Sequence, residues 1–233
     1  MNHIFHHRTK KPSRGRTALV ATLALGCLFG TVNQAAAQTV TPPATPTLIT
    51  PKEGNTAFLL GRAQGTQGYV CLPTAPGAST ASWTVNGARP EATLFTKFFG
   101  QDVQIITHFL SPDTNPNGVL TVIPFGSATW QSSFDTSKVW AAVLNGAAVQ
   151  PSTDIPSCPH VGSIACLLLT SIGSQSGPTR GNLLTPVTFV QRLNTNGGSA
   201  PADGCSVSTD VGKQTLVPYT ADYYFYKADT KYF

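Results

Sequence analysis

The chain has 233 residues, with 15 Lys and Arg against 10 Asp and Glu, and 11% of its residues are charged. Five of the cationic side chains precede residue 17 without any acidic neighbour, so the rest of the chain is balanced in charge. A balanced and weakly charged chain lacks the basic patch that binds nucleic acids or anionic membranes, so we expect neither as a partner.

Residues 1–37 have the pattern of a signal peptide. A basic segment is followed by an apolar run at 18–29, which is too short to cross a bilayer comfortably. Ala35, Ala36 and Ala37 then supply the small residues that a signal peptidase needs. We expect cleavage after Ala37 and export to the periplasm or the medium, as a soluble protein with no membrane span.

The remainder divides by composition into two parts. Residues 38–56 are rich in Pro and Thr and predict an extended linker, with ordered structure from about Phe58. Residues 57–233 combine abundant Gly, Pro, Ser and Thr with many short β-branched runs. We therefore predict one all-β domain over 57–233, built as a sandwich or a flattened barrel.

Strands are predicted from apolar runs that are bounded by turn residues. The run at 164–172 fits either a buried strand or a short helix, and Asn86-Gly87 is a hairpin-turn signal. In the last strand, alternate residues place aromatic side chains on both faces, which is typical of a central strand covered on two sides. The predicted strands are 68–72, 81–85, 92–99, 103–110, 119–123, 128–131, 138–144, 187–193 and 216–226.

Four cysteines remain after the signal, which carries Cys27. Four cysteines in an exported chain predict two disulfides, with three possible connectivities. We favour Cys71–Cys205, which clamps the first predicted strand to the C-terminal region, and Cys158–Cys166, which closes a short loop. The sequence has no CxxC motif, which would indicate a zinc site. We therefore expect neither a metal nor a cofactor.

The C-terminal part of the sequence resembles a family of small secreted bacterial and fungal proteins known only as a domain of unknown function. The resemblance is carried by VTFVQRLNTNGG, then AP, then GC, then VPYTADYYFY, and it extends weakly upstream through YVC, HF and ATWQSSFDTSKV. Residues 111–126 look like an insertion relative to that family. Cys166 stands where the family has a tryptophan, which implies that Cys158–Cys166 is a local addition and Cys71–Cys205 the shared bridge.

Some fungal relatives in that family carry a malate-dehydrogenase label. Such an enzyme needs a strand, a G-x-G-x-x-G turn and a helix to hold the pyrophosphate. The glycines at 61, 65 and 68 have another spacing, and no helical crossover pattern accompanies them. We therefore predict that the protein is not an NAD-dependent dehydrogenase.

Few residues qualify for catalysis or ligand binding. His108 lies in an apolar strand, where a structural role is favoured, and it could otherwise act with Asp135 in a hydrolase. Trp130 precedes polar residues and is the tryptophan best suited to stack on a sugar, although core packing is favoured for it as well. Gln191 and Arg192 could bind an anion, but pairing with Asp222 is the simpler expectation.

These features favour an exported, non-catalytic binding or structural envelope protein. We expect a carbohydrate or another small organic molecule as its ligand. A secreted hydrolase that uses His108 and an aspartate is the alternative. The sequence does not define the oligomeric state.

Overall fold

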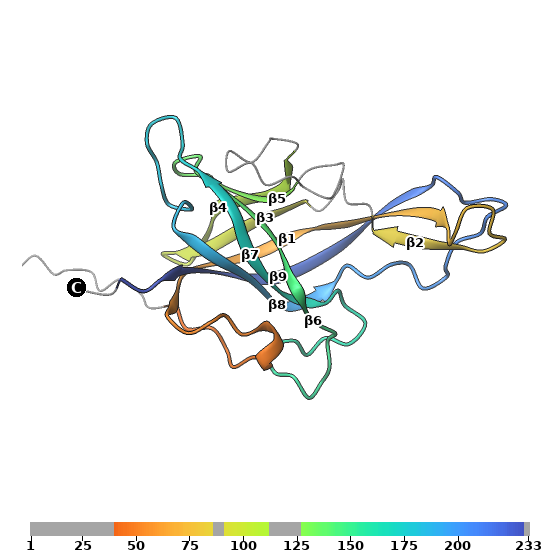
Figure 1. Cartoon of the computed structure of the whole chain (residues 1–233), viewed down its shortest axis with the longest axis horizontal. Helices are drawn as coiled ribbons and strands as arrows, with labels where there is room; N and C mark the ends of the chain where they lie inside the picture. Colours follow the sequence, from red (N-terminus) through yellow and green to blue (C-terminus); the bar gives the residue numbers. More distant parts are fainter. Residues whose placement is uncertain (1–39, 86–90, 112–126, 231–233) are drawn as a thin grey trace, which may run out of the picture. The chain divides into compact units, whose positions relative to one another are not determined.

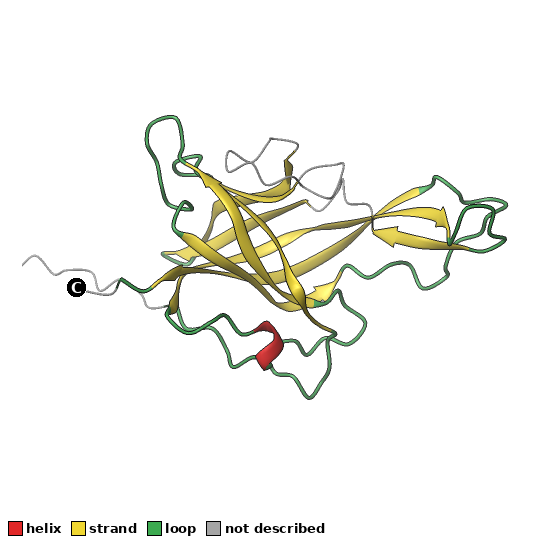
Figure 2. Ribbon diagram, viewed as in Figure 1, coloured by secondary structure: helices red, strands yellow, loops and turns green. Residues whose placement is uncertain are grey.

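The computed structural model describes residues 40–85, 91–111 and 127–230. The chain divides into two compact units, Met1–Ala37 and Gln38–Phe233, and all described residues lie in the second. The regular secondary structure of the described part is all strand apart from one short 3-10 helix, and loops connect these elements (Figure 2). The elements are η1 (Thr47–Ile49), β1 (Asn55–Pro73), β2 (Ala81–Val85), β3 (Glu91–Phe98), β4 (Gln101–Ser111), β5 (Ser127–Ser132), β6 (Lys138–Val149), β7 (Cys166–Gln175), β8 (Val187–Gly197) and β9 (Gln214–Ala228).

The nine strands form one antiparallel sheet that closes on itself. Their order is β2-β1-β3-β4-β5-β6-β7-β8-β9, and β1 also pairs with β9 (Figure 1). The closing pair runs from Asn55↔Ala228 to Val70↔Gln214. The result is an uneven ring, with β2 attached to the far half of β1. The predicted all-β fold is confirmed, and of the two predicted forms, a sandwich or a flattened barrel, the closed sheet matches the barrel. Closure leaves few sheet edges exposed.

The sequence prediction differs from the structure most in the lengths of the strands. β1 is one continuous strand from Asn55 to Pro73, whereas only 68–72 of it was predicted as a strand. Continuity is possible because β9 pairs with nearly all of β1. The ambiguous run at 164–172 is strand β7. The predicted strand at 119–123 and the turn at Asn86-Gly87 lie outside the described residues.

β9 explains how one strand can be covered on both faces. Tyr219, Ala221, Tyr223 and Phe225 alternate along it, and all four are buried in the cluster inside the ring. Tyr224 and Tyr226 point the other way and are buried in a second cluster outside the ring. The alternating aromatic residues of this strand therefore serve two cores, as its pattern predicted.

The outer cluster is closed by the segment that precedes β1. We expected residues 38–56 to be a linker, yet Ile49 within it is fully buried and belongs to the outer cluster with Leu168 and Tyr224. The proline-rich composition hid this apolar contact, because only a few apolar residues, such as Val40 and Ile49, stand among the polar and proline residues. From Val40 onward the segment therefore contributes to the fold.

Both predicted disulfides are present. Cys71 joins Cys205 across 134 residues of sequence, and Cys158 joins Cys166 across 8. The first ties β1 to the loop between β8 and β9, and the second closes the loop between β6 and β7. Disulfides persist in oxidising compartments, so they indicate an exported location.

Within residues 40–85, 91–111 and 127–230, no helix has the length and apolar character needed to cross a bilayer.

Candidate functional site

His108 points into the ring and is packed among aromatic side chains. Its ring stacks on Trp130 at a centroid distance of 4.3 Å and an angle of 7°, and Tyr223 lies 5.7 Å away. Nδ1 is 2.9 Å from the carbonyl oxygen of Thr129. A carbonyl can only accept, so Nδ1 carries the hydrogen and donates it. This environment fixes the orientation of the imidazole without help from a carboxylate.

Burial and the nearby charge of Arg192 make His108 hard to protonate. Burial is the larger cause, and together they lower its pKa to about 4 despite the hydrogen bond to Thr129. The side chain is therefore neutral at neutral pH. A neutral, buried and stacked imidazole fits the structural role that its apolar strand suggested.

The low pKa of His108 predicts a loss of stability in acid. Between about pH 6.5 and 4 the unfolded chain binds a proton at this site that the folded chain does not. The free energy of unfolding should therefore fall by up to about 3 kcal/mol as the pH decreases through this window. Urea titrations of wild type and His108→Gln at several pH values measure the effect. The expected decline should be smaller in the variant, and an equal decline in both would contradict the assignment.

Asp135 is held in a separate structure, the turn after β5. Its Oδ1 accepts hydrogen bonds from the backbone N–H and hydroxyl of Ser137, and Oδ2 accepts from the N–H of Leu183 at 2.8 Å. Burial alone would raise the pKa of Asp135, but these bonds outweigh it and lower the pKa to about 2. The carboxylate thus joins the β5–β6 turn to the β7–β8 loop.

The structure does not bring His108 and Asp135 together. His108 is opposite Trp130 in the β4–β5 register, whereas the turn with Asp135 follows Ser132, and Ser133 bonds to Ile105. Ile105 is three residues from His108 along β4, which corresponds to roughly 10 Å. Thr129 also occupies the position at Nδ1 that the aspartate of a catalytic pair would take.

Trp130 does not form a surface platform for sugars. Only 1% of its surface is exposed, and it contacts His108, Tyr223 and Phe225 inside the ring. The polar residues that follow it in sequence belong to the end of β5 and the next turn, so they gave a misleading indication of exposure.

Gln191 and Arg192 lie on opposite faces of β8, as adjacent strand residues must. Outside the ring, the Gln191 amide donates to the carbonyl of Ile49 at 2.6 Å and accepts from the Tyr226 hydroxyl at 2.7 Å. Inside, Arg192 donates to the carbonyl of Ala165 through Nε and Nη2. Among the described residues, both side chains bond to groups other than Asp222, whose carboxylate accepts from Asn194, so the expected pairing with Asp222 was wrong.

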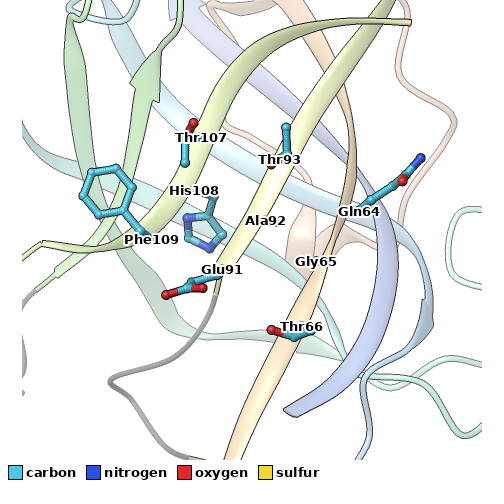
Figure 3. Close-up of a pocket in the computed structure, with 9 residues that line it drawn as sticks. All are labelled: Gln64, Gly65, Thr66, Glu91, Ala92, Thr93, Thr107, His108 and Phe109. Atoms are coloured by element: carbon cyan, nitrogen blue, oxygen red, sulfur yellow. The ribbon is translucent and has the colours of Figure 1, made fainter.

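A hollow of about 440 Å³ lies over β1, β3 and β4 (Figure 3). One row of its side chains crosses the three strands in register, from Gln64 to Thr93 to Thr107. Thr66 and Glu91 form a second pair beside that row, and Phe109 of β4 also lines the hollow. Hydroxyl, amide, carboxylate and aromatic groups are thus gathered on one surface.

The floor of this hollow is the backbone between the two rows. Gly65 is paired with Ala92, and Ala92 with His108, whose side chain points into the ring. A Cβ atom on Gly65 would lie 2.1 Å from the carbonyl oxygen of Glu91. Glycine therefore allows β1 and β3 to approach closely here, and small residues keep the floor low.

The described residues give no indication of a metal centre. Within 40–85, 91–111 and 127–230, no three His, Cys, Asp or Glu side chains come close enough to hold an ion. The hollow contains one carboxylate, that of Glu91, and the imidazole of His108 points into the ring instead. Its chemistry is that of hydrogen bonding and aromatic contact.

Sequence reasoning did not identify this hollow. The signal was the alternation of polar residues in strands whose other face is apolar, as in Thr93 and Thr107. Alternation shows which side chains share a face of their own strand. It does not show which strands are neighbours, so the row across β1, β3 and β4 could not be assembled from the sequence.

Together these features define a disulfide-bonded all-β protein whose strands close into a ring around an aromatic core. The chain belongs to the family described as Protein of unknown function (DUF3455), whose model matches residues 51–227. The resemblance noted in the C-terminal sequence is thereby confirmed. Neither a curated protein nor a solved structure matches the chain.

Proposed function

We propose that this is an exported, non-catalytic binding protein whose hollow over β1, β3 and β4 takes a carbohydrate. The row Gln64–Thr93–Thr107 carries this proposal, because it presents an amide and two hydroxyls in register across three strands. Sugars are bound by such groups together with an aromatic ring, and Phe109 supplies one at the same hollow.

Export is supported by the two disulfides, which are typical of an oxidising compartment. The alanine motif at 35–37 predicts where the signal would be cleaved. We propose that the protein acts outside the cytoplasm after removal of residues 1–37.

The separation of His108 from Asp135 favours binding over hydrolysis. Each of these two side chains already makes hydrogen bonds that hold the fold. His108 is 4% exposed, and its imidazole is stacked inside the ring. A sugar in the hollow would rest on backbone atoms at this position.

A carbohydrate at the hollow predicts a defined loss of affinity when hydroxyls are removed. Neutral, amino-sugar and uronic-acid oligosaccharides would be screened by thermal shift, since a ligand at one hundred times its Kd stabilises the fold by about 2.7 kcal/mol. For the class that binds, Thr93→Val with Thr107→Val should raise the Kd about tenfold or more, as each lost hydrogen bond costs roughly 1 kcal/mol.

Thr84→Val is the matched control, because Thr84 is an exposed threonine on β2, away from the hollow. Its Kd should equal that of wild type. The proposal fails if no oligosaccharide class stabilises the protein, or if Thr84→Val weakens binding as much as the double variant.

A further inference from the structure

The hairpin between β3 and β4 ends in two exposed phenylalanines. Phe98 is 61% and Phe99 91% exposed, and their rings make an edge contact at 4.6 Å between centroids. Phe98 pairs with Gln101, so Phe99 and Gly100 form a two-residue turn. Aromatic side chains this exposed do not contribute to the core, which shows that folding does not require them here.

The backbone conformation at this tip is one that phenylalanine rarely adopts. Phe99 has φ of 47° and Gly100 has φ of 80°, the left-handed region that a type I′ turn requires. Asn-Gly is the preferred pair for this turn, and a bulky residue with positive φ is disfavoured. The sequence thus keeps an aromatic ring where both exposure and backbone conformation favour another residue.

A third exposed phenylalanine lies at the same end of the ring. The β5–β6 turn carries Phe134, which is 66% exposed. This turn lies against the start of β4, because Ser133 donates its N–H to Ile105 and the side chain of Gln104 bonds to Ser133. Two separate turns at this end of the ring therefore carry exposed phenylalanines.

We infer that the β3–β4 tip is an anchor that inserts into the interface of a lipid bilayer. The tip is convex, and a bilayer accepts a convex apolar group without a preformed pocket. Exposed rings on two turns could both contact one extended surface such as a bilayer. A groove in a partner protein would instead be expected to take a single protruding side chain. Aromatic side chains are favoured at the membrane interface.

The charges near the tip determine which bilayer it should bind. Lys97 and Asp102 flank the turn and form a salt bridge of 3.0 Å, so the tip itself is neutral. An anionic headgroup is therefore not needed, and binding should depend weakly on salt.

Vesicle flotation of the exported, processed protein tests the inference. Wild type should float with vesicles of pure phosphatidylcholine. The double variant Phe98→Ser with Phe99→Asn should lose at least tenfold in partition coefficient, because two rings no longer leave water. Its Tm should be unchanged or higher, since asparagine suits the turn.

Leu216→Ser is the matched control. Leu216 is 55% exposed, but it lies near the start of β9, at the opposite end of the ring. This variant should float like wild type. In addition, brominated lipid should quench the fluorescence of the tryptophan introduced by Phe99→Trp.

Four outcomes would overturn the inference. These are no flotation of the wild type, flotation of the tip variant equal to that of wild type, equal losses in Leu216→Ser and the tip variant, and binding only to vesicles with anionic lipid.

Discussion

Replacing Cys71 and Cys205 together by alanine should lower the free energy of unfolding by about 5 kcal/mol. The bond closes a loop of 134 residues, and in the chain-entropy model a cross-link of this length removes about that much freedom from the unfolded chain. Cys71 is fully buried, and its backbone also bonds to Gly212 and Lys213. The bond therefore fastens the β8–β9 loop to β1 as well as limiting the unfolded chain.

The pair Cys158→Ala with Cys166→Ala provides the comparison within the same chain. Its loop spans only 8 residues, so the same model gives roughly 2.5 kcal/mol. Guanidinium unfolding of wild type and both double variants measures the difference, with the m-value as a check on two-state behaviour. Equal losses for the two bonds would show that local packing, and not loop length, sets their contributions.

Trp130→Ala should cost about 3–5 kcal/mol, the range for a large aromatic removed from a core. The side chain is 1% exposed and stacked on His108, and it makes edge contacts with Tyr223 and Phe225. Truncation would therefore open a cavity at the centre of the ring. Chemical denaturation of the purified variant measures the loss.

Trp130→Phe separates the volume of this side chain from its polar group. Among the described residues, no acceptor lies within hydrogen-bond distance of the indole nitrogen of Trp130. Phenylalanine therefore removes a buried donor without breaking a bond and should cost less than half as much as alanine. Trp83→Ala, at a partly exposed tryptophan bonded to Gly204, should cost about 1–2 kcal/mol. A phenylalanine variant as unstable as the alanine variant would contradict this account.

Much of the fold could be predicted because it depends on local patterns. Alternation in the last strand predicted its two buried faces, and export predicted the pairing of cysteines as disulfides. The closure of the ring could not be predicted in the same way. Pairing β1 with β9 joins residues as far apart as Asn55 and Ala228, and nothing in either segment alone specifies its partner.

The candidate site shows the same limit more sharply. His108 was predicted to be a structural residue, and its stacking on Trp130 and bond to Thr129 agree with that prediction. Trp130, Gln191 and Arg192 were considered for ligand binding because their residue types suit it. Their burial and hydrogen bonds depend on neighbours from distant strands, which residue type and sequence position do not reveal.

The pairing of β1 with β9 also has a consequence for the timing of folding. The ring cannot close until the C-terminal strand is available, and the bond from Cys71 must wait for Cys205. Contacts this distant in sequence are slow to form. A chain that emerges from an export channel N-terminus first would therefore remain an open sheet, with its aromatic interior accessible to chaperones and proteases, until its last strand is released.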